Sequence, residues 1–348
     1  MPQLLASPGI VIPTGIDYID RFIGGQRPGC CHGFLTASGE GKTVQMIDLS
    51  VQNALNFYRS GRATNSRPKL SVLFTYSEST EAIQKLIWAN AAMIRHSKLA
   101  DMTDWSQLTT QANLEDYERL LPGQASVDGV IYSETERWDR AAEWLNETHQ
   151  CVDMSDRQTG HGQGYVPEIV MYLDHLRRRF NAEIGAVHID YAKPLCINYM
   201  EAKGIDSDEL FRVLSGLGKD LVDQVAKPFN CVVWLAHNFV ARKWNMPPTE
   251  LVHHRDAMSA REFANDMVVC GGLGVRDTTT YCSLLNWSKG SNFPIGLQDA
   301  PVLDLNREFL QFVEVSGLFQ ADVRTESIIQ LYDTRATYAQ GLRSRIIL

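Results

Sequence analysis

Residues 36–43 read Thr-Ala-Ser-Gly-Glu-Gly-Lys-Thr, between the apolar run Gly33-Phe34-Leu35 and a helical stretch. Glycines at this spacing let backbone N–H groups converge on an anion, and the next helix directs its N-terminus at bound phosphates. Lys42 can reach the β- and γ-phosphates, and the Thr43 hydroxyl can hold Mg²⁺. Thr36 replaces the usual first glycine of the pattern GxxxxGK[ST]. The stretch predicts a phosphate-binding loop formed by Ser38, Gly39, Glu40, Gly41, Lys42 and Thr43.

The composition of the 348 residues fits one large α/β domain or two small ones. The 44% apolar and 21% charged residues are ordinary for a globular protein. No apolar run approaches the roughly 20 residues of a membrane span, and no basic-then-apolar targeting signal opens the chain. A net charge of −8 argues against a surface that coats nucleic acid indiscriminately, although assembly can still form a local basic channel.

Seven cysteines are present, with no CxxC pair, and most fall in apolar runs. This usage is typical of reduced core residues in a cytosolic protein, and it indicates neither a zinc site nor a disulfide framework. We therefore expect a cytoplasmic protein without membrane contact.

Apolar runs and helical patterns alternate along the chain. Strands are predicted at about 30–36, 70–76, 151–154, 184–190, 230–236, 267–271 and 279–287, and helices at about 43–59, 81–95, 138–147, 167–179 and 208–226. The alternation predicts an α/β fold with a mostly parallel, twisted sheet flanked by helices. We expect a short N-terminal arm (1–12), one nucleotide-binding domain (13–320) and a helical C-terminal tail (321–348).

Two carboxylates follow predicted strands, where ATP hydrolysis would need them. Asp190 ends the apolar run 184–190, the place of a Walker B carboxylate that holds the Mg²⁺ shell. Glu78 follows the strand at 70–76, on the edge where ligands of open α/β sheets collect, and it can orient and deprotonate water. A strand-capping aspartate and a surface glutamate near a helix N-cap are the alternative interpretations.

His237 follows the apolar strand Cys231–Ala236 on the same expected edge. A polar residue there can sense the γ-phosphate and pass its presence to the next loop. A structural histidine with satisfied ring nitrogens explains the same position almost equally well.

The order of these motifs resembles the DnaB-like replicative helicase family, within the RecA-like ATPases of the DnaB and KaiC type. The resemblance spans roughly residues 12–315. It rests on Thr14-Gly15-Ile16-Asp17, Gly24-Gly25, Pro28-Gly29, Ser38–Thr43, Glu78, Ile189-Asp190-Tyr191, His237, Arg255–Glu262 and Asn265–Val269. It implies a RecA-like P-loop core in which Lys42, Glu78 and His237 act in catalysis.

The resemblance also implies what the protein acts on. It implies an ATP- and Mg²⁺-dependent DNA helicase or translocase that forms a hexameric ring, hydrolyses ATP at subunit interfaces, and acts on single-stranded DNA in replication with partner proteins. Two alternatives stay open: a RecA- or RadA-like recombinase that forms filaments, and a KaiC-like regulatory ATPase that does not bind DNA.

Two departures from the family pattern concern the subunit interface. The family's N-terminal domain and linker helix have no counterpart in the 348 residues, so we expect a ring without that linker contact. The family also carries a Lys/Arg pair on a late strand that reaches the next subunit's ATP site. Here the matching stretch 284–290 offers Lys289 alone, and a lysine lacks the guanidinium fork, which predicts weaker catalysis in trans. An ordinary strand-end lysine also fits.

Two segments are placed to face DNA. One follows Asp190, at about 196–207, and carries Lys203; the other, at 241–255, interleaves Trp244 with basic residues. Cations beside an aromatic ring suit a single-stranded backbone with base stacking, and a ring of six subunits would multiply a weak contact. An ordinary solvated loop would carry the same residues. The predicted DNA contacts are Lys203, Arg242, Lys243 and Arg255.

Overall fold

Among the residues that the computed structural model describes, nine strands form one central sheet. The described residues are 11–76, 79–102, 104–111, 132–154, 165–258, 262–290, 297, 299–316 and 318–331. The strand order is β3-β2-β4-β5-β1-β6-β7-β8-β9. The sheet is parallel from β3 to β6 and antiparallel from β6 to β9.

The strand bounds follow. The parallel strands are β1 (Cys31–Thr36), β2 (Lys69–Thr75), β3 (His149–Asp153), β4 (Glu183–Asp190), β5 (Val232–Asn238) and β6 (Met267–Leu273). The antiparallel strands are β7 (Cys282–Lys289), β8 (Val302–Asn306) and β9 (Gln311–Glu314), and a separate hairpin pairs β10 (Phe319–Asp322) with β11 (Ser327–Gln330). All seven predicted strands are confirmed, with boundary shifts of one to three residues.

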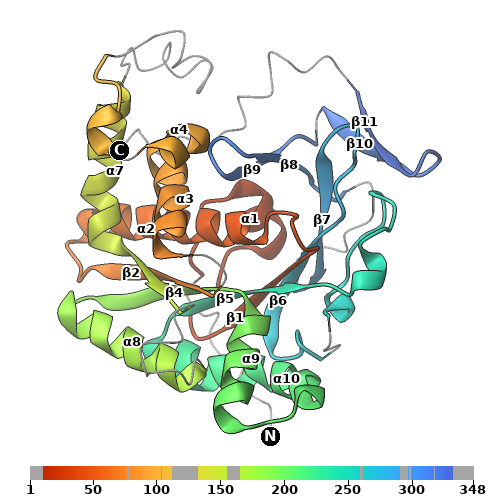
Figure 1. Cartoon of the computed structure of the whole chain (residues 1–348), viewed down its shortest axis with the longest axis horizontal. Coiled ribbons are helices and arrows are strands. Elements are labelled where there is room, and N and C mark those ends of the chain that lie inside the picture. Colours follow the sequence, from red (N-terminus) through yellow and green to blue (C-terminus); the bar gives the residue numbers. More distant parts are fainter. Residues whose placement is uncertain are drawn as a thin grey trace, which may run out of the picture.

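Helices cover both faces of the sheet (Figure 1). One face carries α1 (Asp17–Ile23), α2 (Lys42–Thr64), α3 (Thr80–Ala92), α4 (His96–Asp101) and α7 (Glu134–Thr148). The other carries α8 (Val166–Arg179), α9 (Ala192–Lys203) and α10 (Leu210–Leu221), which continues through a π-helical turn (Val222–Ala226) into α11 (Lys227–Phe229). None of the described helices is long and apolar enough to cross a membrane.

The central strands are apolar throughout because each face of the sheet is buried. On β1, Phe34 packs into the cluster beneath α2 and α3, whereas its neighbour Leu35 packs into the cluster beneath α8 and α10. Successive residues of a strand point to opposite faces, so a doubly covered strand has no polar face to show. Two large apolar clusters therefore hold β1 rigidly beneath the residues that follow it.

Two sequence expectations are wrong. The segment around 196–207 was expected to be a loop, but α9 extends to Lys203 and ends at Gly204, whose φ of 64° is the left-handed conformation of a helix C-cap. The tail from 321 was expected to be helical, but its described part forms the β10–β11 hairpin, where Ile328 is buried against the β7–β9 layer. Alternation of buried and exposed residues every second position fixes a strand there. Residues 1–10 and 332–348 lie outside the described residues.

Candidate nucleotide-binding site

The predicted phosphate-binding loop connects β1 to α2, as its sequence requires. Gly39 and Gly41 have φ values of 81° and 90°, a left-handed region that favours glycine. A Cβ on Gly41 would also lie 2.7 Å from Cζ of Phe312. The departure at Thr36 is explained by its place: it is the last residue of β1, in extended backbone, where no glycine is needed.

The end of β4 supplies the carboxylate that such a loop requires. Oγ1 of Thr43 donates a 2.7 Å hydrogen bond to Oδ2 of Asp190, the last residue of β4. These residues are 147 positions apart, and the parallel strands between them align the carboxyl ends at one sheet edge. A hydroxyl and a carboxylate at hydrogen-bond distance form the oxygen donor set that Mg²⁺ prefers. The site therefore fits the expected metal, with Thr43 and Asp190 as its protein ligands.

Lys42 lies in the same edge and is held by two neighbours. Its Nζ donates a 2.7 Å hydrogen bond to Oδ1 of Asn238 and sits 4.5 Å from the ring centroid of Tyr191. Burial lowers the pKa of Lys42, and the carboxylate of Asp190 partly offsets this. A partly desolvated ammonium gains strongly from an anionic phosphate, because the low local dielectric strengthens the attraction. Lys42 is thus poised to bind phosphate.

Asn238 is a site residue that sequence reasoning missed. It ends β5, opposite Thr36 in the β1–β5 register, so its side chain faces the phosphate-binding loop. The predicted sensor, His237, is the residue before it and points to the other face. Its Nε2 donates to the carbonyl oxygen of Met258 at 2.8 Å, and its ring packs against Phe263. The two-residue period of a strand was the signal that distinguishes these positions.

The protonation state of His237 follows from its surroundings. Burial lowers its pKa to about 4; the Met258 hydrogen bond opposes this shift and the charge of Lys42 adds to it. The ring is therefore neutral at physiological pH, with the proton on Nε2. His237 links the end of β5 to the end of the 241–256 loop.

Glu78 lies outside the described residues, so its predicted role stays a prediction. The residues on either side are described. Thr75 is paired with Asp190 in the β2–β4 register, and the N–H of Tyr76 donates to the carbonyl oxygen of Asp190 at 3.0 Å. On the far side, Thr80 begins α3 and its Oγ1 donates to Asp153 at 2.9 Å. The strand before Glu78 thus ends beside the Walker B carboxylate.

Lys289, the predicted trans cation, ends β7 and bonds within its own chain. Its Nζ donates to the carbonyl oxygens of Ala264 and, at 2.8 Å, Asn265. Burial lowers the pKa of Lys289, and nearby Cys270 and Asp266 oppose this. To reach a neighbouring subunit, Lys289 would have to leave both carbonyl groups.

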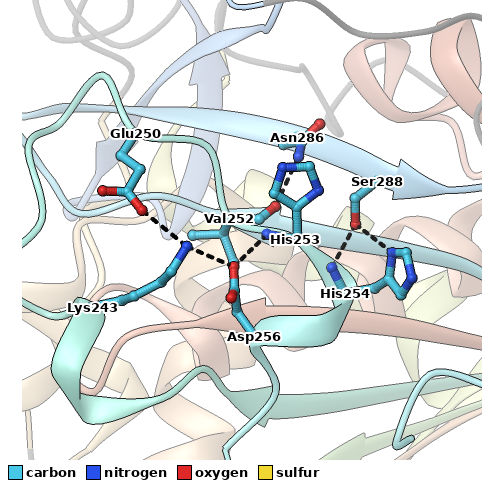
Figure 2. A network of polar contacts seen from close by, with 8 residues as sticks. All are labelled: Lys243, Glu250, Val252, His253, His254, Asp256, Asn286 and Ser288. Carbon is cyan, nitrogen blue, oxygen red and sulfur yellow. Dashed lines mark hydrogen bonds and ion pairs between the residues drawn. The ribbon is translucent and has the colours of Figure 1, made fainter. Parts of the chain in front are cut away.

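The 241–256 loop holds its central cation internally. Figure 2 shows Lys243 between two carboxylates: Nζ lies 2.9 Å from Glu250 and 3.0 Å from Asp256. These hydrogen bonds outweigh the effect of burial and raise the pKa of Lys243. The N–H of His254 also donates to Oγ of Ser288 at 2.6 Å, which ties the loop to β7 beside Lys289.

The remaining predicted DNA contacts lie at the end of a helix and in short turns. Lys203 is exposed at the C-terminal end of α9, and Arg255 is exposed in a short 3₁₀ turn (His254–Asp256). Arg242 lies in the turn Ala241–Lys243, and its side chain is outside the described part. The predicted contacts are thus divided between α9 and the 241–256 loop, and Lys243 forms ion pairs within that loop.

Comparison with known proteins identifies the fold. No family model matches the chain, and no curated protein matches it. Among solved structures, the ATPase domain of a DnaB-like helicase superposes with a TM-score of 0.59 at 14% identity, over 89% of this chain and 93% of that chain. A DnaB-like replicative helicase, solved in a study of its interactions with primase, superposes with a TM-score of 0.58 at 14% identity over 88% of this chain.

The chain has the RecA-like P-loop fold. The fold predicted from the sequence, and its likeness to the ATPase domains of DnaB-like helicases, are confirmed at the level of architecture. This chain spans 64% of the length of the replicative helicase. A KaiC-like protein from Pyrococcus horikoshii OT3 is a more distant match, with a TM-score of 0.43 at 12% identity over 88% of this chain and 99% of that chain.

Proposed function

We propose that this protein is an ATP-dependent DNA helicase or translocase of the DnaB-like type, acting in the cytoplasm on single-stranded DNA during replication. The observation that carries the proposal is the convergence of Lys42, Thr43 and Asp190 at one edge of a RecA-like sheet. That arrangement supports binding and hydrolysis of ATP with Mg²⁺. The fold of the DnaB-like neighbours supports the choice of a DNA motor.

Each residue has a separate task in the proposed hydrolysis. The backbone of residues 38–41 and the ammonium of Lys42 bind the β- and γ-phosphates. Thr43 and Asp190 hold the metal, and Mg²⁺ bound there neutralises charge on the phosphate oxygens. Glu78 orients the attacking water and accepts its proton. Residues at the subunit interface, including Lys289, contribute positive charge to the neighbouring site in a homo-oligomeric ring.

The proposed coupling to DNA runs through β5. Lys42 leaves Asn238 when it takes up a phosphate, which frees the Asn238 amide for the γ-phosphate. The next residue, His237, holds Met258 at the end of the 241–256 loop. A change at Asn238 is thereby passed along two residues of backbone to the segment that carries Arg242, Lys243 and Arg255.

The first test measures ATP turnover with and without single-stranded DNA. We expect DNA to stimulate the wild-type protein, and we expect Lys42→Ala and Glu78→Gln each to lower turnover by about 100-fold, as for loss of one transition-state contact. Lys219→Ala, an exposed lysine on α10, is the matched control and should keep wild-type turnover. Full activity in both Lys42→Ala and Glu78→Gln would contradict the proposal.

Assembly is tested separately. We expect mass measurement with ATP and Mg²⁺ to give six subunits, and electron microscopy with single-stranded DNA and a non-hydrolysable ATP analogue to show closed rings. Open filaments would instead support a recombinase.

A second candidate is a regulatory ATPase that controls protein contacts without binding DNA. The neutralisation of Lys243 by Glu250 and Asp256 favours it, because this removes a cation from the loop that would face DNA. ATP turnover that single-stranded DNA does not stimulate, together with no DNA binding at low salt, would select this candidate.

A further inference from the structure

A cavity of about 610 Å³ lies beside the phosphate-binding loop and has no role in the binding of phosphate or metal. Its lining comes from the turn between β6 and β7 and from the end of β8. The lining residues are Arg276, Tyr281, Asp304, Leu305, Asn306, Arg307 and Glu308. This volume falls within the roughly 300–1,000 Å³ of typical small-molecule pockets.

Two contacts place the cavity against the phosphate-binding loop. Nε of Arg276 lies 3.5 Å from a carboxylate oxygen of Glu40 in that loop. On the other side, a Cβ on Gly41 would lie 3.3 Å from Cδ2 of Leu305. The cavity is therefore continuous with the loop that would hold the phosphates.

Strand order gives the direction in which a nucleotide would extend. Asp190 on β4 and Asn238 on β5 mark the metal and terminal-phosphate side of β1. On the opposite side of β1 lie β6, β7 and β8. A triphosphate with its γ-end toward β4 leaves its nucleoside toward β6 to β8, where the cavity lies.

The walls of the cavity are held in place. The turn before Tyr281 is closed by Asp277, whose Oδ1 accepts from the N–H groups of Thr279 and Thr280 at 2.8 and 2.9 Å. The β8–β9 turn is bound to α3, since Nδ2 of Asn90 donates to the carbonyl oxygen of Leu310 at 2.6 Å. Figure 1 shows β8 and β9 on the same side of the sheet as α2 and α3. The cavity is therefore formed before any ligand arrives.

The chemistry of the lining suits an aromatic base with hydrogen-bond donors. Tyr281 is 62% exposed, so a flat ring can stack on it, and a guanidinium such as that of Arg276 also stacks on aromatic faces. Asp304 offers carboxylate oxygens to a donor. Burial raises the pKa of Asp304 to about 6, although the backbone N–H of Leu305 and the charges of Arg276 and Arg307 oppose the rise. The carboxyl group is thus shielded from water, which strengthens a hydrogen bond to it.

We propose that this cavity binds the adenosine part of the nucleotide, with Asp304 accepting a hydrogen bond from the 6-amino group of adenine and with Tyr281 and Arg276 against the ring. The inference rests on the proposed ATP site and adds the residues that select the base. Asp304 is then a specificity residue, and the P-loop remains the phosphate site.

The test compares three ligands with Mg²⁺ present: ATP, inorganic triphosphate, and purine riboside triphosphate, which lacks only the 6-amino group. We expect the wild-type protein to bind ATP about tenfold more tightly than purine riboside triphosphate, the effect of one hydrogen bond to a charged group. In Asp304→Ala this ratio should fall to about one, while the affinity for inorganic triphosphate stays unchanged. Asp299→Ala, an exposed aspartate, is the control and should keep the wild-type ratio.

Tyr281→Ala provides a second variant whose exposed position spares the core. We expect it to weaken ATP binding several-fold and to leave inorganic triphosphate binding unchanged; it decides the matter if Asp304→Ala does not fold. Wild-type binding of ATP and inorganic triphosphate with equal affinity, or unchanged affinity ratios in the folded variants, would overturn the inference. Absence of binding by all three ligands would instead overturn the proposed ATP site.

Discussion

The phosphate edge and the 241–256 loop both carry charged residues, but they use them in opposite ways. At the phosphate edge, Lys42 pairs with a neutral amide and lies near one carboxylate, so its charge remains available to an anion. In the loop, two carboxylates flank Lys243 at 2.9 and 3.0 Å and neutralise it. Charge at the phosphate edge is arranged for a ligand, whereas charge at Lys243 is arranged for the loop itself.

The difference teaches where sequence position alone predicts chemistry. Lys42 and Asp190 are fixed by strands whose carboxyl ends must meet, so their convergence follows from the fold. The partners of Lys243 lie further along an irregular segment, and nothing in the strand pattern fixes their distance from it. Changes to the two regions, and to the sheet that supports them, would test this contrast.

Asp190→Asn should have the largest effect, because it removes the charge that faces Thr43 at the phosphate edge. We expect ATP turnover to fall by about 100-fold and the Mg²⁺ concentration for half-maximal activity to rise. Asp174→Asn, on the exposed surface of α8, is the control. Steady-state turnover over a Mg²⁺ titration measures both quantities. Unchanged turnover in Asp190→Asn would show that the phosphate edge is not arranged for a metal.

Buried histidines in the sheet should give the next largest effect, on stability. Burial lowers the pKa values of His32 and His149 to about 4 and that of His188 to about 3, against 6.5 for the ordinary side chain. A depressed folded-state pKa means that the unfolded chain binds the protons first. Stability is therefore complete above pH 6.5 and is lost as the pH falls toward 4 and 3. At pH 5 each histidine costs about 2 kcal/mol of unfolding free energy.

Urea unfolding at pH 7.5 and pH 5.0 measures this loss. His149→Gln should reduce the difference between the two pH values by about 2 kcal/mol. His253→Gln, on the exposed side of the 241–256 loop, should leave the difference as in the wild type. The same pH dependence in His149→Gln and the wild type would show that burial of this ring does not govern acid stability.

Asn238 and His237 should separate binding from coupling, with a smaller effect. Asn238→Ala removes the acceptor of Lys42, and we expect it to change KM or kcat for ATP by about tenfold, the effect of one hydrogen bond to a charged group. His237→Leu removes the donor to Met258 and should mainly lower the ratio of turnover with DNA to turnover without it. The reverse assignment of the two effects would place the sensor at His237 and not at Asn238.

Much of the fold could be predicted from the sequence, because buried parallel strands are apolar runs and the phosphate-binding loop has a fixed place after the first of them. Asp190 and Thr43 meet as that pattern requires. The β8–β9 turn was not predicted, since its short strands show no clear period, and Asp304 became visible as a site residue only beside the loop it faces. Asn238 was missed for a different reason: adjacent strand residues face opposite sides, and a sequence motif does not say which one faces the phosphates.

The smallest effect should come from the loop's own carboxylates. Glu250→Gln removes one of the two partners of Lys243, so more of its charge becomes available, and we expect single-stranded DNA to bind about threefold more tightly with a steeper salt dependence. Arg255→Ala, which removes an exposed cation, should weaken binding and lower the salt slope by about one. Lys243→Ala should change affinity less than Arg255→Ala does, because its charge is already neutralised. Fluorescence anisotropy at two salt concentrations measures all three variants. If Lys243→Ala weakens binding as much as Arg255→Ala, the ion pairs of Lys243 open when DNA binds, and the contrast between the two regions disappears.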